Sequence, residues 1–136
     1  MHFTVYHSLP DAARMIREAV FVREQGFQQE FDETDDIAVH IVAWDGTAPA
    51  GTCRVYPGED CFHIGRVAVL PRYRGTGLGR DLMHQAEDAI RSAGGTVADL
   101  SGQVQASGFY KKLGYVPVGD VYPDEGCPHI RMQKQL

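Results

Sequence analysis

Cysteine is scarce in this sequence, and its spacing favours neither disulfides nor a metal site. The 136 residues include three cysteines, Cys53, Cys61 and Cys127. An odd number without close pairing is not a disulfide framework, so we expect free thiols in a reducing compartment, which predicts the cytoplasm. Cys127 and His129 stand two residues apart, but two ligands do not make a metal site. We therefore expect no bound metal.

The sequence also lacks a long apolar run and an excess of basic residues. No apolar run is long enough to span a bilayer, and residues 1–5 have neither the basic start nor the apolar core of a signal peptide. We expect no membrane partner. There are 13 Lys and Arg against 18 Asp and Glu, a net charge of −5, so we expect no nucleic-acid partner either. This charge is compatible with a cationic or amine substrate.

The rest of the composition is that of one globular domain. With 43% hydrophobic residues, the chain suits a single core, and we expect one domain over residues 1–136. Helical spacing predicts a helix capped by Ser8 and extending toward Gly26, a second from Leu78 to Gly94, and a short third at 104–113. Alternating or apolar stretches predict strands at 3–7, 39–44, 51–56, 61–70, 96–100, 115–122 and 128–133.

This order of elements predicts an α/β fold with a mixed sheet. The first strands are joined by hairpin turns and should be antiparallel, and one right-handed β-α-β crossover should follow Leu70. Residues 28–37 are rich in Asp and Glu and are expected to form a loop. The acids from Glu30 to Asp36 either steer a cationic amine or simply form a solvated loop.

The most informative segment is a glycine-rich turn between a strand and a helix, Arg74-Gly75-Thr76-Gly77-Leu78-Gly79. Glycines let successive N–H groups point to one spot, and the following helix adds its own unpaired N–H groups and positive dipole end. Arg74 and Arg80 can add charge-assisted contacts. The turn therefore predicts a diphosphate site, although a glycine-rich loop can also be a mere connection.

Two other anion-binding motifs do not fit this turn. A P-loop needs Lys followed by Ser or Thr after its last glycine, and Arg80-Asp81 stands there instead. A dinucleotide fingerprint needs a third glycine at position 80 and a parallel sheet before it, whereas antiparallel hairpins are predicted here. A nucleotide of these two classes is therefore not the favoured ligand.

Three segments together resemble the GNAT superfamily of N-acetyltransferases. They are Val67-Ala68-Val69, the turn Arg74–Gly79, and Phe109-Tyr110-Lys111-Lys112-Leu113-Gly114-Tyr115, and the resemblance spans about residues 37–120. Residues 20–26 and 125–130 look like a small bacterial subgroup whose members mostly lack assigned substrates. The resemblance implies a GNAT-like fold, a central mixed β-sheet flanked by helices on both faces, and acetyl-CoA as co-substrate.

The resemblance also implies roles for individual residues. The backbone of Val67, Ala68 and Val69 would pair with the pantetheine arm and hold the oxyanion, and Tyr110 would protonate the departing thiolate. Gln103 stands where the family often has an Asn near the CoA arm. The pyrophosphate would lie on Arg74, Gly75, Thr76, Gly77, Leu78, Gly79 and Arg80. Without the resemblance, Tyr110 could equally be a core residue beside Phe109.

The general base is less well marked. Many family members carry a Glu on the strand before the turn, but this strand has His63-Ile64-Gly65-Arg66. The candidate bases, acting directly or through water, are Glu24, Glu30, His40 and His63. We assign Glu30 and His40 to the catalytic set with Tyr110, and Glu24, His63 and Arg66 to substrate contacts. A histidine on a strand can also be structural, and Arg66 can be a surface or ion-paired residue.

The sequence thus predicts an acetyl-CoA-dependent N-acetyltransferase acting on a primary amine of a small molecule or peptide. The amine would attack the thioester directly in a ternary complex, since no cysteine lies beside an evident base. The alternatives are a non-catalytic acyl-CoA-binding or sensor protein on the same fold, and a binding module for another phosphorylated ligand. The chain is expected to be a monomer or a homodimer.

Overall fold

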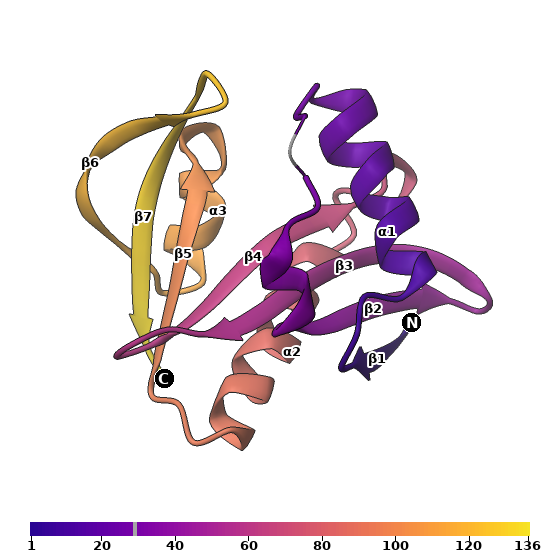
Figure 1. The fold of residues 1–136 in the computed structure, drawn as a ribbon, viewed down its shortest axis with the longest axis horizontal. Coiled ribbons are helices and arrows are strands. Elements are labelled where there is room, and N and C mark those ends of the chain that lie inside the picture. Colours follow the sequence, from indigo (N-terminus) through magenta and orange to yellow (C-terminus); the bar gives the residue numbers. More distant parts are fainter. Residues whose placement is uncertain (29) are drawn as a thin grey trace.

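The fold is built on one seven-stranded sheet. A computed structural model describes residues 1–28 and 30–136, and its strand order is β1-β2-β3-β4-β5-β7-β6 (Figure 1). Neighbouring strands are antiparallel except β4 and β5, which are parallel. The predicted mixed sheet is confirmed. The strands are β1 (His2–Tyr6), β2 (Val39–Asp45), β3 (Ala48–Pro57), β4 (Phe62–Val69), β5 (Val97–Gln103), β6 (Val116–Asp124) and β7 (Cys127–Gln135).

Helices cover both faces of the sheet, as expected. On one face lies α1 (Asp11–Arg17), extended by a π-helical segment, Glu18–Glu24, and packed on Val42 and Ala68. On the other face lies α2 (Leu78–Ser92), which buries Leu82, Met83, Ala86 and Ile90 against the sheet. The shorter helices are α3 (Ser107–Lys112) and the 3₁₀ segments Glu33–Asp36, Pro71–Tyr73 and Val104–Ala106. None of the described helices is long and apolar enough to cross a membrane.

The start of α1 differs from the prediction. Pro10, not Ser8, holds the N-cap position, in an extended conformation, and its carbonyl accepts the Arg14 amide proton. The proline ring fixes φ near the value that a helix entrance needs and lacks an N–H that would require a partner. The prediction of Ser8 as the cap was therefore wrong, because the proline two residues later sets the boundary.

The two parallel strands in the middle of the sheet separate after a short contact. β4 and β5 pair at Phe62–Ala98 and His63–Asp99 and diverge beyond these positions (Figure 1). A bulge accompanies the divergence, because Arg66 and Val67 of β4 lie opposite the single residue Cys53 of β3. Arg66 has φ +49°, and such a bulge bends its strand. The β4-α2-β5 connection is the predicted crossover, and its strands open a wedge.

Candidate active site

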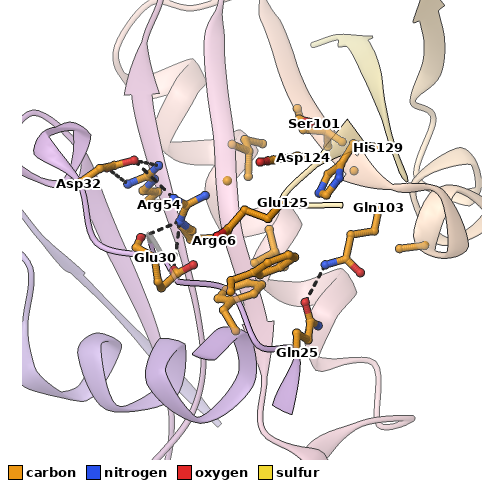
Figure 2. Close-up of a pocket in the computed structure, with 18 of the residues that line it drawn as sticks. Gln25, Glu30, Asp32, Arg54, Arg66, Ser101, Gln103, Asp124, Glu125 and His129 are labelled. Carbon is orange, nitrogen blue, oxygen red and sulfur yellow. Dashed lines mark hydrogen bonds and ion pairs between the residues drawn. The ribbon is translucent and has the colours of Figure 1, made fainter. Parts of the chain in front are cut away.

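A cavity of about 530 Å³ fills the wedge between the diverging strands. One wall comes from β3 and β4 with Phe21, Gln25, Phe27, Glu30 and Asp32, and the other from β5, α3 and the β6–β7 turn (Figure 2). Segments far apart in the sequence therefore meet here. The lining residues that the argument below uses are Glu30, Asp32, Arg54, Tyr56, Arg66, Val67, Ser101, Gly102, Gln103, Tyr110, Asp124, Glu125 and His129.

The glycine turn lies at the end of β4 and leads into α2. Gly75 and Gly77 have φ +76° and +89°, a left-handed conformation that other residues adopt only with strain. Thr76 Oγ1 donates a hydrogen bond to the Tyr73 carbonyl and so fixes the turn. In the described structure no side chain caps the first turn of α2, so its N–H groups are open to an anion. The geometry suits the diphosphate site predicted from the sequence.

The two arginines of the turn differ in their surroundings. Arg74 forms a bidentate ion pair with Glu24, with two N···O distances of 2.8 Å, and its Nε donates to the Val69 carbonyl at 3.0 Å. Arg74 thus ties the end of the π-helical segment to the end of β4. Its hydrogen bond lowers the pKa of Glu24. Arg80 is exposed, with its Nε 3.4 Å from Asp81.

Tyr110 lies on the cavity wall, packed against the backbone of β5. Its ring lies so close to Gly102 that a Cβ there would come within 3.0 Å of Tyr110 Cε2. Phe109 and Tyr115 make edge-on contacts with the same ring, at centroid distances of 5.0 and 6.1 Å. Burial raises the pKa of Tyr110 to about 12. The hydroxyl therefore keeps its proton at neutral pH and can act as a proton donor.

The glycine turn and Tyr110 are connected through α3. A Cβ at Gly79 would lie 3.3 Å from Phe109 Cζ, so the first turn of α2 packs directly against the residue before Tyr110. On the same wall as Tyr110, Gln103 Nε2 donates to Gln25 Oε1 of the opposite wall at 2.7 Å (Figure 2). Val67 and Gln103 line the cavity, while the Ala68 side chain is buried toward α1.

An ionic cluster forms the wall opposite β5. Glu30 Oε2 lies 2.8 Å from Arg17 Nε and 3.0 Å from Arg66 Nε. Asp35 Oδ1 lies 2.8 Å from Arg17 and 2.9 Å from Arg54, and Arg54 also pairs with Asp32 at 2.7 Å. The cluster consists of Arg17, Glu30, Asp32, Asp35, Arg54 and Arg66. It joins α1 to β3 and to the bulge of β4.

The solvated-loop alternative for the acidic run is therefore wrong for Glu30 and Asp35. Glu30 and Asp35 are only 3% and 5% exposed, and both pair with arginines of other elements. The run is held by long-range ion pairs that no local pattern reveals. Gln29, which belongs to the same predicted loop, lies outside the described residues.

Burial and ion pairing act in opposite directions on these carboxyl groups. Burial raises the pKa of Glu30, and this outweighs the opposing effect of Arg66 and Arg17. Burial also acts to raise the pKa of Asp35, but hydrogen bonds and charges from Arg17 and Arg54 outweigh it and lower the value. The two arginines therefore stabilise the charged form of Asp35.

The two candidate histidines lie away from the cavity lining. His40 is 1% exposed, and its Nε2 lies 3.0 Å from the Asp35 carbonyl. Burial lowers the pKa of His40, which favours the neutral ring. His63 stacks on Tyr56, and its Nδ1 lies 3.2 Å from Asp99 Oδ1. The structure thus brings Glu30, Arg66, Val67, Gln103 and Tyr110 to the cavity and places His40 and His63 elsewhere.

The lining also includes polar residues that had not been selected from the sequence, among them Ser101, Asp124, Glu125 and His129. His129 lies on the wall opposite Arg54 and Arg66 (Figure 2). Its Nδ1 is 2.8 Å from the Cys127 carbonyl, which can only accept, so Nδ1 carries the proton and Nε2 is left as a proton acceptor. The only signal in the sequence was the resemblance of residues 125–130 to a subgroup.

Neither Cys53 nor Cys61 is an activated nucleophile. Burial raises the pKa of Cys53 to about 12. Burial, with the nearby Asp99 charge, also raises the pKa of Cys61. A thiol is a nucleophile only as the thiolate, so both remain in the unreactive form near neutral pH.

Known proteins are similar to this chain in sequence and in fold. Residues 11–136 match the acetyltransferase (GNAT) domain family. The uncharacterized N-acetyltransferase YjcF of Bacillus subtilis is 36% identical over 88% of this chain and 87% of its own. An acyl-CoA N-acyltransferase from Pseudomonas aeruginosa superposes with a TM-score of 0.89 at 32% identity, covering 98% of both chains.

Escherichia coli ElaA gives a similar result. Its crystal structure superposes with a TM-score of 0.87 at 30% identity, covering 98% of this chain and 99% of that one. The match therefore extends over the glycine turn and both walls of the wedge. By sequence and by fold, the chain belongs to the GNAT acetyltransferase family.

Proposed function

We propose that this protein transfers an acetyl group from acetyl-CoA to a primary amine by direct attack in a ternary complex. The observation that carries the proposal is the wedge between β4 and β5, with the glycine turn at the end of β4 and Tyr110 on the opposite wall. An acyl-CoA N-acyltransferase among the similar structures supports the choice of co-substrate.

The donor would bind mainly to backbone groups. The N–H groups of residues 74–80 and the uncapped start of α2 would hold the pyrophosphate. Beyond His63 the edge of β4 facing β5 has no strand partner in the described structure, so Val67, Ala68 and Val69 can pair with the pantetheine arm as an added strand. An N–H of this edge would also stabilise the oxyanion of the tetrahedral intermediate.

Tyr110 is the general acid in this proposal. The amine nitrogen attacks the thioester carbon, and collapse of the intermediate breaks the carbon–sulfur bond. The phenolic proton of Tyr110 then neutralises the CoA thiolate. The raised pKa of Tyr110, a consequence of its burial, keeps that proton in place until the thiolate forms.

For the general base we favour His129 over Glu30. Both line the cavity, but protonation of Glu30 would weaken its ion pairs with Arg17 and Arg66. His129 has its Nδ1 fixed on the Cys127 carbonyl and leaves Nε2 to accept the amine proton. Glu30 would then hold Arg66 in position. His40 has no part in this scheme because it is buried outside the cavity lining.

The acceptor side of the cavity is polar. Ser101, Asp124, Glu125 and His129 lie on the wall opposite the arginines, and Glu125 also accepts the Gln28 amide proton at 3.0 Å. Carboxylates at this position would favour an acceptor with a cationic group, consistent with a small amine or the amino group of a peptide. A bulky apolar amine would leave these polar groups without partners.

The test is a screen of primary amines with acetyl-CoA, following free thiol release and identifying the product by mass spectrometry. The proposal expects thiol release that depends on one class of polar amine, with a product heavier by one acetyl group. Tight CoA binding without release for any amine would favour the non-catalytic acyl-CoA sensor. Failure to bind CoA would contradict both.

A further inference from the structure

Three side chains with metal-binding atoms meet at the start of β4, outside the cavity. Cys61 Sγ lies 3.9 Å from His63 Nε2, and His63 Nδ1 lies 3.2 Å from Asp99 Oδ1. One ligand atom from each residue can be chosen so that all lie within 4.8 Å of one another. This group could not be recognised in the sequence, because Asp99 is 36 positions from His63. The two residues become neighbours only through the parallel pairing of β4 and β5.

We propose that Cys61, His63 and Asp99 form a binding site for a Zn²⁺ ion. Thiolate, imidazole and carboxylate are the three donor types that zinc uses in proteins, at roughly 2.0–2.3 Å from the ion. Tetrahedral ligands at those distances lie roughly 3.4–3.6 Å apart, so binding would draw the three side chains together by up to about 1.2 Å from the outer limit observed here. Cys61 and His63 are only half-buried and have room to move. Water would take the fourth position.

The neighbours of the cluster already orient its ligands. Asp99 Oδ2 accepts hydrogen bonds from Arg131 Nε at 2.6 Å and Gln133 Nε2 at 2.9 Å, which leaves Oδ1 directed at His63. The His63 ring stacks on Tyr56 at a centroid distance of 5.0 Å. A Cβ at Gly58 would lie 2.5 Å from His63 Nε2, so the glycine leaves the space that the ring occupies. Such outer contacts fix ligand geometry in metal sites.

The position of the cluster gives the ion a structural role. In the described structure β4 and β5 pair at two positions, and His63–Asp99 is one of them. An ion held by both strands would reinforce the junction at which the two halves of the sheet separate. Tyr56 lies between the cluster and the cavity, since it lines the cavity and stacks on His63. We therefore expect zinc to raise stability rather than to take part in acetyl transfer.

The test uses the untagged full chain, freed of metal by a chelator and titrated with Zn²⁺ by calorimetry and with Co²⁺ by absorption spectroscopy. We expect one ion per chain, a thiolate-to-cobalt charge-transfer band, and a higher midpoint of thermal unfolding with Zn²⁺. Cys61→Ser should remove the band and weaken Zn²⁺ binding by at least about tenfold. Cys127→Ser changes another half-buried cysteine, and it should leave the cobalt charge-transfer band and the Zn²⁺ affinity unchanged.

A second variant covers the case in which Cys61→Ser is not folded by circular dichroism. Gly58→Ala keeps all three ligands but displaces the His63 ring, and it should also weaken Zn²⁺ binding. Absence of Zn²⁺ binding by the parent chain would overturn the proposal. So would equal affinity in the folded Cys61→Ser chain, or an equal loss in Cys127→Ser, because the ion would then bind elsewhere.

Discussion

The glycine turn Arg74–Gly79 is formed by backbone, whereas the ionic cluster in the cavity wall is formed by side chains. The turn Arg74–Gly79 consists of backbone in left-handed and helical conformations, its N–H groups belong to one short segment, and it is largely exposed. The cluster consists of side chains from α1, the acidic segment, β3 and β4, and most of its charges are buried. We infer that the turn can change without loss of the fold, whereas the cluster supports both the fold and the cavity wall.

The largest expected effect is on the cluster. Asp35→Asn removes a buried carboxylate that pairs with Arg17 and Arg54. Removing one partner of a buried ion pair typically costs about 3–5 kcal/mol because the remaining charge is left buried, so we expect a loss of that order in the free energy of unfolding. Urea unfolding measures it. Asp36→Asn, an exposed neighbour, is the matched control and should change little. Equal losses in both variants would show that the cluster has no special role.

The next largest expected effect is on kcat and concerns Tyr110, the proposed general acid. Tyr110→Phe removes the proposed proton donor and keeps the ring that packs on Gly102. General acid catalysis contributes about 10²–10⁴-fold to rate, so kcat should fall by at least about 100-fold. The affinity for CoA should stay near that of the parent chain, because the pyrophosphate is held at the turn. Steady-state kinetics and CoA titration measure both. An unchanged kcat would remove Tyr110 from the mechanism.

The same contrast explains what the sequence could predict. The turn could be selected from the sequence because the residues proposed to hold the pyrophosphate, 74–80, are consecutive and lie between a clear strand and an amphipathic helix. The mixed sheet and the crossover after Leu70 were predicted from local alternation and helical spacing, and both are confirmed. Local chemistry predicts sites that are made of local backbone.

The two cavity walls could not be predicted in this way. A solvated loop remained an alternative for Glu30 and Asp35, because their partners Arg17 and Arg54 are distant in the sequence. His129 reaches the cavity only because β7 inserts between β5 and β6. The bulge at Arg66 depends on the register between β3 and β4. These features need the three-dimensional pairing of distant segments, which one sequence does not reveal.

A smaller effect tests whether the turn acts through its backbone. Gly77→Ala adds a side chain where φ is +89°, and the added Cβ would meet only the flexible end of Arg80. A non-glycine residue in this conformation costs about 1–2 kcal/mol, so the turn should relax and move its N–H groups. We expect CoA affinity to fall by about tenfold, equivalent to ~1.4 kcal/mol, measured by calorimetry.

The control for this variant has the same backbone strain at a different place. Gly46→Ala lies in the β2–β3 turn, with φ +60° and open space around the added Cβ. Both variants should lose similar stability, but only Gly77→Ala should lose CoA affinity. If Gly46→Ala weakened CoA binding as much, the effect would be one of general stability and the assignment of the turn would fail.

The smallest expected effect is a pH dependence carried by Tyr110. Its pKa is raised from 10 to about 12 because burial disfavours the phenolate. The unfolded chain therefore loses this proton first as pH rises, so the stability is present below pH 10 and is lost as pH approaches 12. One such group lowers the free energy of unfolding by about 0.8 kcal/mol at pH 10.5 relative to pH 8. Tyr115 and Cys53, whose pKa values are also raised by burial, lower the free energy of unfolding further at high pH.

The contribution of Tyr110 is isolated by comparing the parent chain with Tyr110→Phe. Urea unfolding at pH 8 and pH 10.5 should give a shallower pH dependence for the variant. An equal pH dependence of the free energy of unfolding in the two chains would mean that Tyr110 is hydrated in solution. That result would weaken its assignment as the general acid that protonates the departing thiolate.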